Sequence, residues 1–215
     1  MTYPIFNSFV NKIQNELESR NINIKKFKTW HEDRINATGL EILIDVQGGS
    51  HPIKEVSINF DWDRFREMAL ATRLKGLGEH PMLQKKKLKS VSVNPKIDVE
   101  VNWIFDEQQP QIALINVSES ERLEQAQRWM RSIHKQVNEL YDDEEVITRW
   151  HIELEGNGVE KHISVVNLIS YFQYSFSHLK SLNEVHQFID SRLEELLLIS
   201  KQVRRISDKT VSEAA

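Results

Sequence analysis

Residues Leu40–Trp62 read LEILIDVQGGSHPIKEVSINFDW. Large apolar side chains occupy every second position in Leu40–Val46 and again in Val56–Trp62. A period of two is typical of strands that bury one face and expose the other. The segment Gly48–Pro52 between them has the composition of a turn. We therefore predict a β-hairpin, and because two isolated strands are marginally stable in water, its apolar face needs further strands or helices to cover it.

Three segments in the body of the chain repeat apolar residues at intervals of three and four, as amphipathic helices do. The first follows Pro4, which suits the first turn of a helix, and extends to about Arg20. The second begins at Asp61 or Asp63, either of which can cap a helix. The third opens with the capping-box sequence Ser118–Glu121. Its expected packing stripe consists of Leu123, Ala126, Met130, Ile133, Val137 and Leu140.

A fourth and longer helix is predicted near the C-terminus. It begins with the capping sequence Ser181–Glu184 and carries a regular apolar stripe to Ile206. Three additional apolar residues, Phe188, Leu197 and Leu198, widen its apolar face beyond a single packing seam. The extra surface is covered either by another segment of the chain or by a second protein.

Further strands are predicted on both sides of the third helix. Ile97–Phe105 alternates clearly, 111–117 is expected to pair with it, and the lysine-rich segment Ile22–Trp30 is expected to be an edge strand. A second hairpin is predicted over 146–166 around Asn157-Gly158, a dipeptide that favours a type I′ turn. Residues 167–179 fit both a helix and a strand, and their spacing favours a helix.

Hairpins interspersed with amphipathic helices predict an α+β fold. We expect a mainly antiparallel sheet built from hairpins, one face covered by amphipathic helices, with the long C-terminal helix as one of them. No linker rich in Pro, Gly or Ser interrupts the chain. We therefore predict a single α+β domain over residues 1–206 and a flexible C-terminal tail over 207–215.

Composition narrows the classes of function. The 28 basic and 32 acidic residues give a net charge of −4, so we expect neither nucleic acid nor a membrane as partner. The chain has no cysteine, which excludes disulfides, thiolate nucleophiles and cysteine-based metal sites. No apolar run is long enough to span a bilayer, and Met1–Ser8 lacks the basic leader of a signal peptide. A cytoplasmic location is the expectation.

The second hairpin carries the best candidate for chemistry. A two-residue turn at Asn157-Gly158 places Glu153 opposite His162 and puts His151 on the same face. Two imidazoles and one carboxylate are a ligand set for a divalent metal, so His151, Glu153 and His162 are the candidate metal ligands. The alternative is that this face is simply solvated and that Glu153 and His162 form a cross-strand pair.

Other groups of polar residues have structural explanations. The cluster Trp30–Asp33 is expected at the end of a strand, and His178 and His186 are too far apart to form a designed pair. The basic run Lys85–Lys89 lacks nearby aromatic residues for stacking bases and is expected to be a solvated loop. Asp142–Glu145 lacks the spaced carboxylates and the glycine of a calcium loop.

Surplus apolar surface without a catalytic motif favours an interaction protein over an enzyme. We expect a non-enzymatic protein-interaction or assembly module without a cofactor, which binds a protein partner or self-associates through the C-terminal helix. The alternative is a metal-dependent hydrolase in which His151, Glu153 and His162 hold a divalent metal and a bound water is the nucleophile.

Overall fold

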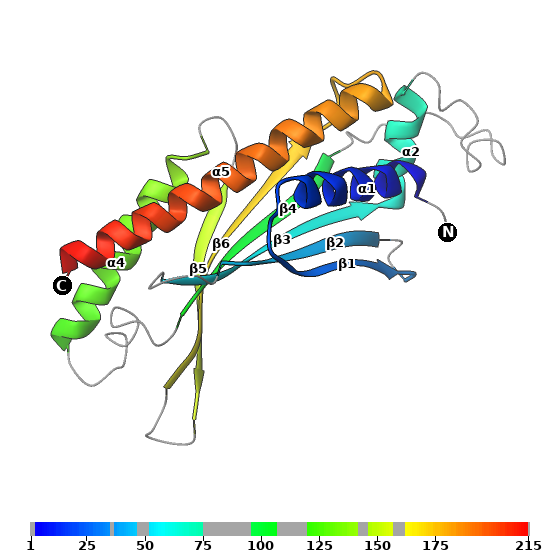
Figure 1. Cartoon of the computed structure of the whole chain (residues 1–215). Helices are drawn as coiled ribbons and strands as arrows, with labels where there is room; N and C mark the ends of the chain where they lie inside the picture. The colour runs from blue at the N-terminus through cyan, green and yellow to red at the C-terminus, as the bar shows by residue number, and fades with distance from the viewer. Residues whose placement is uncertain are drawn as a thin grey trace. The chain divides into compact units, whose positions relative to one another are not determined.

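The computed structural model describes residues 3–34, 37–46, 52–74, 96–106, 120–141, 146–156 and 162–214 (Figure 1). In these residues one six-stranded sheet has the strand order β1-β2-β3-β4-β6-β5, and its strands pair in antiparallel fashion. The strands are β1 (Ile24–Glu32), β2 (Ala37–Asp45), β3 (Ile53–Asp63), β4 (Lys96–Phe105), β5 (Ile147–Glu155) and β6 (His162–Ser175). The described helices are α1 (Pro4–Ser19), α2 (Arg64–Arg73), α4 (Ser120–Asn138) and α5 (Leu182–Ala214). The predicted α+β class, with a long C-terminal helix, is confirmed.

The contacts within the chain define two compact units. The first unit comprises Met1–Ile42, Asn59–Val99 and Gln173–Leu196. The second comprises Leu43–Ile58, Glu100–Phe172 and Leu197–Ala215. Several strands and α5 contribute residues to both, and the prediction of a single domain over residues 1–206 stays a prediction.

In the first unit, α1 and the beginning of α5 pack side by side against one face of the sheet (Figure 1). The ring of Phe9 in α1 meets that of Phe60 in β3 edge to face, with centroids 5.2 Å apart. Polar contacts join the two helices at their margin. The Ser8 hydroxyl lies 2.6 Å from His186 Nε2, and Lys12 Nζ lies 3.2 Å from Asp190 Oδ2. The apolar face of the predicted first helix is therefore core.

The hairpin predicted from Leu40–Trp62 is present as β2 and β3. Its alternating apolar side chains, including Leu40, Ile42, Ile58 and Trp62, are buried as expected. Asp63 caps α2 by accepting a hydrogen bond from the backbone N–H of Arg66 at 2.8 Å. The lysine-rich strand is also confirmed, since β1 lies at one end of the strand order.

In the second unit, α4 packs against β5. Its residues Ile133 and Val137 are buried as the predicted stripe requires. Trp129, which that stripe omitted, is also buried and forms an aromatic cluster with Phe105 and Trp150. The indole N–H of Trp150 donates to the carbonyl of Met130 at 3.2 Å. The cluster therefore joins α4 to β4 and β5.

Two predictions of secondary structure need correction. The segment favoured as a helix over 167–179 continues β6 to Ser175, where the buried Phe172 and Tyr174 flank the exposed Gln173 as in a strand. Helix α5 continues to Ala214, beyond the end expected at Ile206, whereas the flexibility of residues 207–215 stays a prediction. The predicted strand at 111–117, the cap at Ser118 and the turn at Asn157-Gly158 lie outside the described residues.

Candidate functional site

The pairing of β5 with β6 differs from the predicted register. Glu153 lies opposite Val165 instead of His162, and Glu155 lies opposite His162. The register shifts between Glu153 and Leu154, where Ser164 is an extra residue on β6. On the loop side of this bulge the pairing is already displaced by two residues from the predicted register, and the bulge, which adds one residue to one strand only, displaces it by one more; an alternating pattern reveals neither displacement. The predicted opposition of Glu153 and His162 is therefore wrong.

Two of the three predicted metal ligands are in contact. His151 Nε2 lies 2.8 Å from Glu153 Oε1, and both side chains are about half exposed on β5. In the observed register the backbone of His162 belongs to the same face of the hairpin, since it opposes Glu155. The His162 side chain lies outside the described part of the chain, and the described side chains contain no group of three metal-ligating residues. A metal at His151, Glu153 and His162 stays a prediction.

The remaining described histidines singled out by the sequence have partners within the first unit. His31 Nε2 lies 2.8 Å from Asp33 Oδ1, and its ring packs edge-on against Tyr3. His178 packs edge-on against Phe188, and His186 contacts Ser8. These contacts fit the structural explanation given for each. The runs Lys85–Lys89 and Asp142–Glu145 lie outside the described residues.

A buried carboxyl group that sequence reasoning missed holds the start of α1. Glu67 of α2 is 1% exposed. It accepts hydrogen bonds from the backbone N–H groups of Ile5 at 2.7 Å and Phe6 at 3.2 Å, and from the indole N–H of Trp62 at 2.9 Å. Tyr3, the residue before α1, makes no capping hydrogen bond with its side chain. Glu67 thus satisfies helix-terminal donors, which is a structural role.

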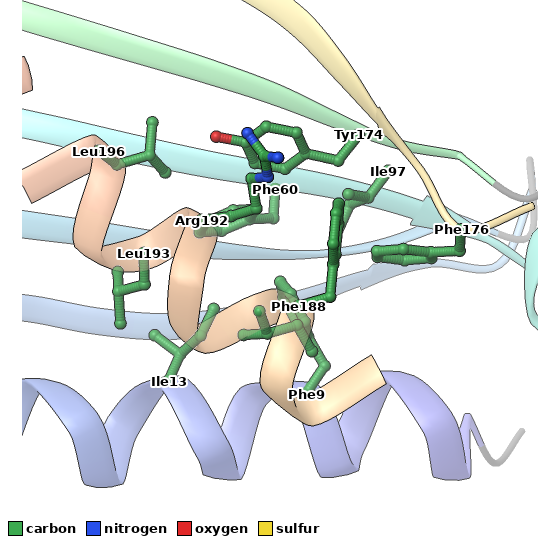
Figure 2. A pocket seen from close by; sticks show the side chains of 11 residues that line it. Phe9, Ile13, Phe60, Ile97, Tyr174, Phe176, Phe188, Arg192, Leu193 and Leu196 are labelled. Atoms are coloured by element: carbon green, nitrogen blue, oxygen red, sulfur yellow. The ribbon is translucent and has the colours of Figure 1, made fainter. Parts of the chain in front are cut away.

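A narrow apolar cavity lies in the first unit between α1, α5 and the sheet (Figure 2). Its free volume is about 10 Å³, far below the roughly 300–1,000 Å³ of typical ligand pockets. The guanidinium of Arg192 beside it lies over the rings of Tyr174 and Phe188, 5.4 and 5.2 Å from their centroids, and is paired with Glu195. The cavity therefore resembles an imperfectly filled core more than a substrate pocket. Its lining residues are Phe9, Ile13, Phe60, Ile97, Tyr174, Phe176, Phe188, Ile189, Arg192, Leu193 and Leu196.

Strand β5 of the second unit exposes large apolar side chains at the end of the described sheet. It is the last strand in the described sheet, with β6 as its neighbour. Ile147 is 66% exposed and Leu154 is 47% exposed, although both are large and apolar. Arg149 donates to the Tyr171 hydroxyl at 2.9 Å, and burial raises the pKa of Tyr171 above its ordinary value. Within the described part of the chain no strand lies beyond this β5 edge, residues Ile147–Glu155.

The outer surface of α5 shows less apolar area than its sequence suggests. Phe188 packs against Tyr174 and Phe176, so part of the widened face is covered by the chain itself. Leu198 is 54% exposed, but Glu194 and Lys201 on the same side of the helix are exposed as well. A single exposed leucine among charged residues is common on protein surfaces.

Among the described residues, no helix combines the length and the apolar character that crossing a membrane requires. The chain matches no protein-family model, and comparisons with curated proteins and with solved structures gave no match.

Proposed function

We propose that the chain is a non-enzymatic protein-interaction or assembly module that associates with further copies of itself in the cytoplasm. The observation that supports the proposal most is the β5 edge, which is the last strand among the described residues and exposes Ile147 and Leu154. Outer strands offer backbone donors and acceptors to an incoming strand, and exposed apolar side chains add area to such a contact.

Helix α5 is the second surface to consider, as the sequence suggested. Leu197 and Leu198 lie on the part of α5 that belongs to the second unit. Only Leu198 is largely exposed, whereas Leu197 is half-buried. The β5 edge exposes two large apolar side chains, Ile147 and Leu154, whereas this part of α5 exposes Leu198, so the β5 edge is favoured as the contact surface.

Sedimentation velocity of the full chain over a range of concentrations tests the proposal. We expect a reversible increase in mass from one chain to two as the concentration rises. A mass that stays at one chain up to the solubility limit contradicts self-association.

A metal-dependent hydrolase is the second candidate. His151 and Glu153 are in contact on β5, and β5 pairs with β6, the strand that begins at His162. In this alternative the three side chains hold a divalent metal, which activates a bound water. Elemental analysis of untagged protein purified without chelator tests it. Stoichiometric metal that is lost in His151→Ala supports the alternative, and protein without metal whose stability does not respond to Zn²⁺, Mn²⁺ or Fe²⁺ refutes it.

A further inference from the structure

We propose that two copies of this chain join their β5 edges in antiparallel orientation about a twofold axis, so that the sheet continues from one copy into the other. The inference rests on the proposed function, because it names the partner and the surface of that association. Its basis is the geometry and the charge pattern of β5.

The backbone of β5 is suited to accept another strand. The register shift of the hairpin puts the extra residue, Ser164, on β6, so β5 itself continues without an inserted residue from Ile147 to Glu155. A strand without a bulge keeps its outward N–H and C=O groups regularly spaced, and the described residues place no further strand beside β5. A second strand can therefore pair along its whole length.

The two strands at the ends of the described strand order differ in charge. Strand β1 carries Lys25, Lys26 and Lys28, and a row of like charges discourages pairing between copies. Strand β5 has Arg149 and His151 in its first half and Glu153 and Glu155 in its second half. Antiparallel pairing of two such strands brings Arg149 of each copy to Glu155 of the other and sets the imidazole of His151 beside Glu153, whereas parallel pairing brings like charges together. The charge pattern thus selects a second copy in antiparallel orientation.

One register matches both faces of the strand. With Ile152 opposite Ile152 of the second copy, His151 faces Glu153 and Arg149 faces Glu155 on one side of the sheet. On the other side Trp150 faces Leu154, whose exposed side chain gains an aromatic neighbour. Such a contact is isologous, since each copy contributes the same residues.

Cysteine cross-linking tests this register directly, because the chain has no cysteine of its own. We expect Ile152→Cys to form a disulfide-linked dimer on oxidation, since its two copies face each other within disulfide reach. Glu153→Cys alone should not cross-link. In this register position 153 of one copy lies opposite position 151 of the other, so the two introduced cysteines are two residues apart along the strand. A mixture of His151→Cys and Glu153→Cys proteins should cross-link. Equal yields from Ile152→Cys and Glu153→Cys contradict the register.

Charge reversal provides a second test that leaves the strand's apolar residues intact. Arg149→Glu and Glu155→Arg each place like charges across the contact twice, so we expect about tenfold weaker self-association of either variant. Mixing the two variants restores opposite charges at both positions, and the mixed dimer should form with the original affinity. The matched control is Arg128→Glu, an exposed charge reversal on α4 of the same unit, which should not change the association.

The outcomes separate the inference from the function on which it rests. If the unmodified chain dimerises but the charge reversals and the cysteine pairs have no effect, the β5 edge is not the contact, and the assembly function stands. If the unmodified chain stays monomeric at all concentrations, both fail. Circular dichroism of each variant establishes that a lost dimer is not a lost fold.

Discussion

Replacing Glu67 with alanine tests how the first unit is held together. The carboxyl group of Glu67 is the acceptor shared by the N–H groups of Ile5 and Phe6 and the indole of Trp62. All three bonds lie in the buried interior. Removing the acceptor leaves donors of α1 without a partner in a place that water does not reach.

The expected cost follows from the number of donors affected. A buried donor left unsatisfied costs about 1–3 kcal/mol. The three donors share one carboxyl group, so the costs of losing their bonds do not add fully. We expect Glu67→Ala to lower the free energy of unfolding by about 3–6 kcal/mol. A domain is stable by only about 5–15 kcal/mol, so the variant will be close to unfolding at room temperature. Glu67→Gln keeps one oxygen acceptor, and we expect it to cost about 1–3 kcal/mol.

Urea denaturation followed by tryptophan fluorescence measures both variants. The matched control is Glu18→Ala, which removes an exposed glutamate of α1 that accepts a hydrogen bond from Gln14 at 2.9 Å, and which should change stability by less than about 0.5 kcal/mol. If Glu67→Ala costs no more than Glu18→Ala, the carboxyl group does not stabilise the start of α1, and the reasoning is refuted.

Three further predictions concern other parts of the chain. Leu198→Glu should leave self-association unchanged if the β5 edge carries it, and a lost dimer in sedimentation would instead identify α5 as the contact. Trp129→Ala removes a buried ring of the cluster with Phe105 and Trp150 and should cost about 3–5 kcal/mol in urea denaturation. Burial raises the pKa of Tyr3, so the folded state retains the phenolic proton that the unfolded state loses above pH of about 10. Stability should therefore fall as the pH rises through this range, and the fall should be smaller in Tyr3→Phe; an equal fall in both proteins contradicts the assignment.

The period-two and helical patterns predicted most of the described fold because burial on one face imposes them. The alternation in Leu40–Trp62 corresponds to β2 and β3, whose apolar side chains are buried on one side. The pattern failed at β6, where Asn167 and Ile169 are buried as well as Leu168. A strand buried on both faces loses its alternation, and its apolar residues then also fit helical spacing.

The candidate site depended on features that alternation does not encode. A two-residue displacement of the hairpin pairing and the bulge at Ser164 together changed which residue opposes Glu153, although His151 and Glu153 could be placed on one face from their spacing alone. The burial of Glu67 was not predictable from its neighbours, because a charged residue in an amphipathic helix is ordinarily exposed. The position of β5 at the end of the described strand order likewise could not be read from its sequence.

The oxidised Ile152→Cys protein provides the most direct measurement of the proposed assembly. Non-reducing electrophoresis and mass spectrometry of the digested product report whether a disulfide joins position 152 of two chains. The antiparallel β5 contact predicts a dimer linked through this position that Glu153→Cys alone does not form. An Ile152→Cys protein that dimerises in sedimentation yet forms no disulfide would contradict it.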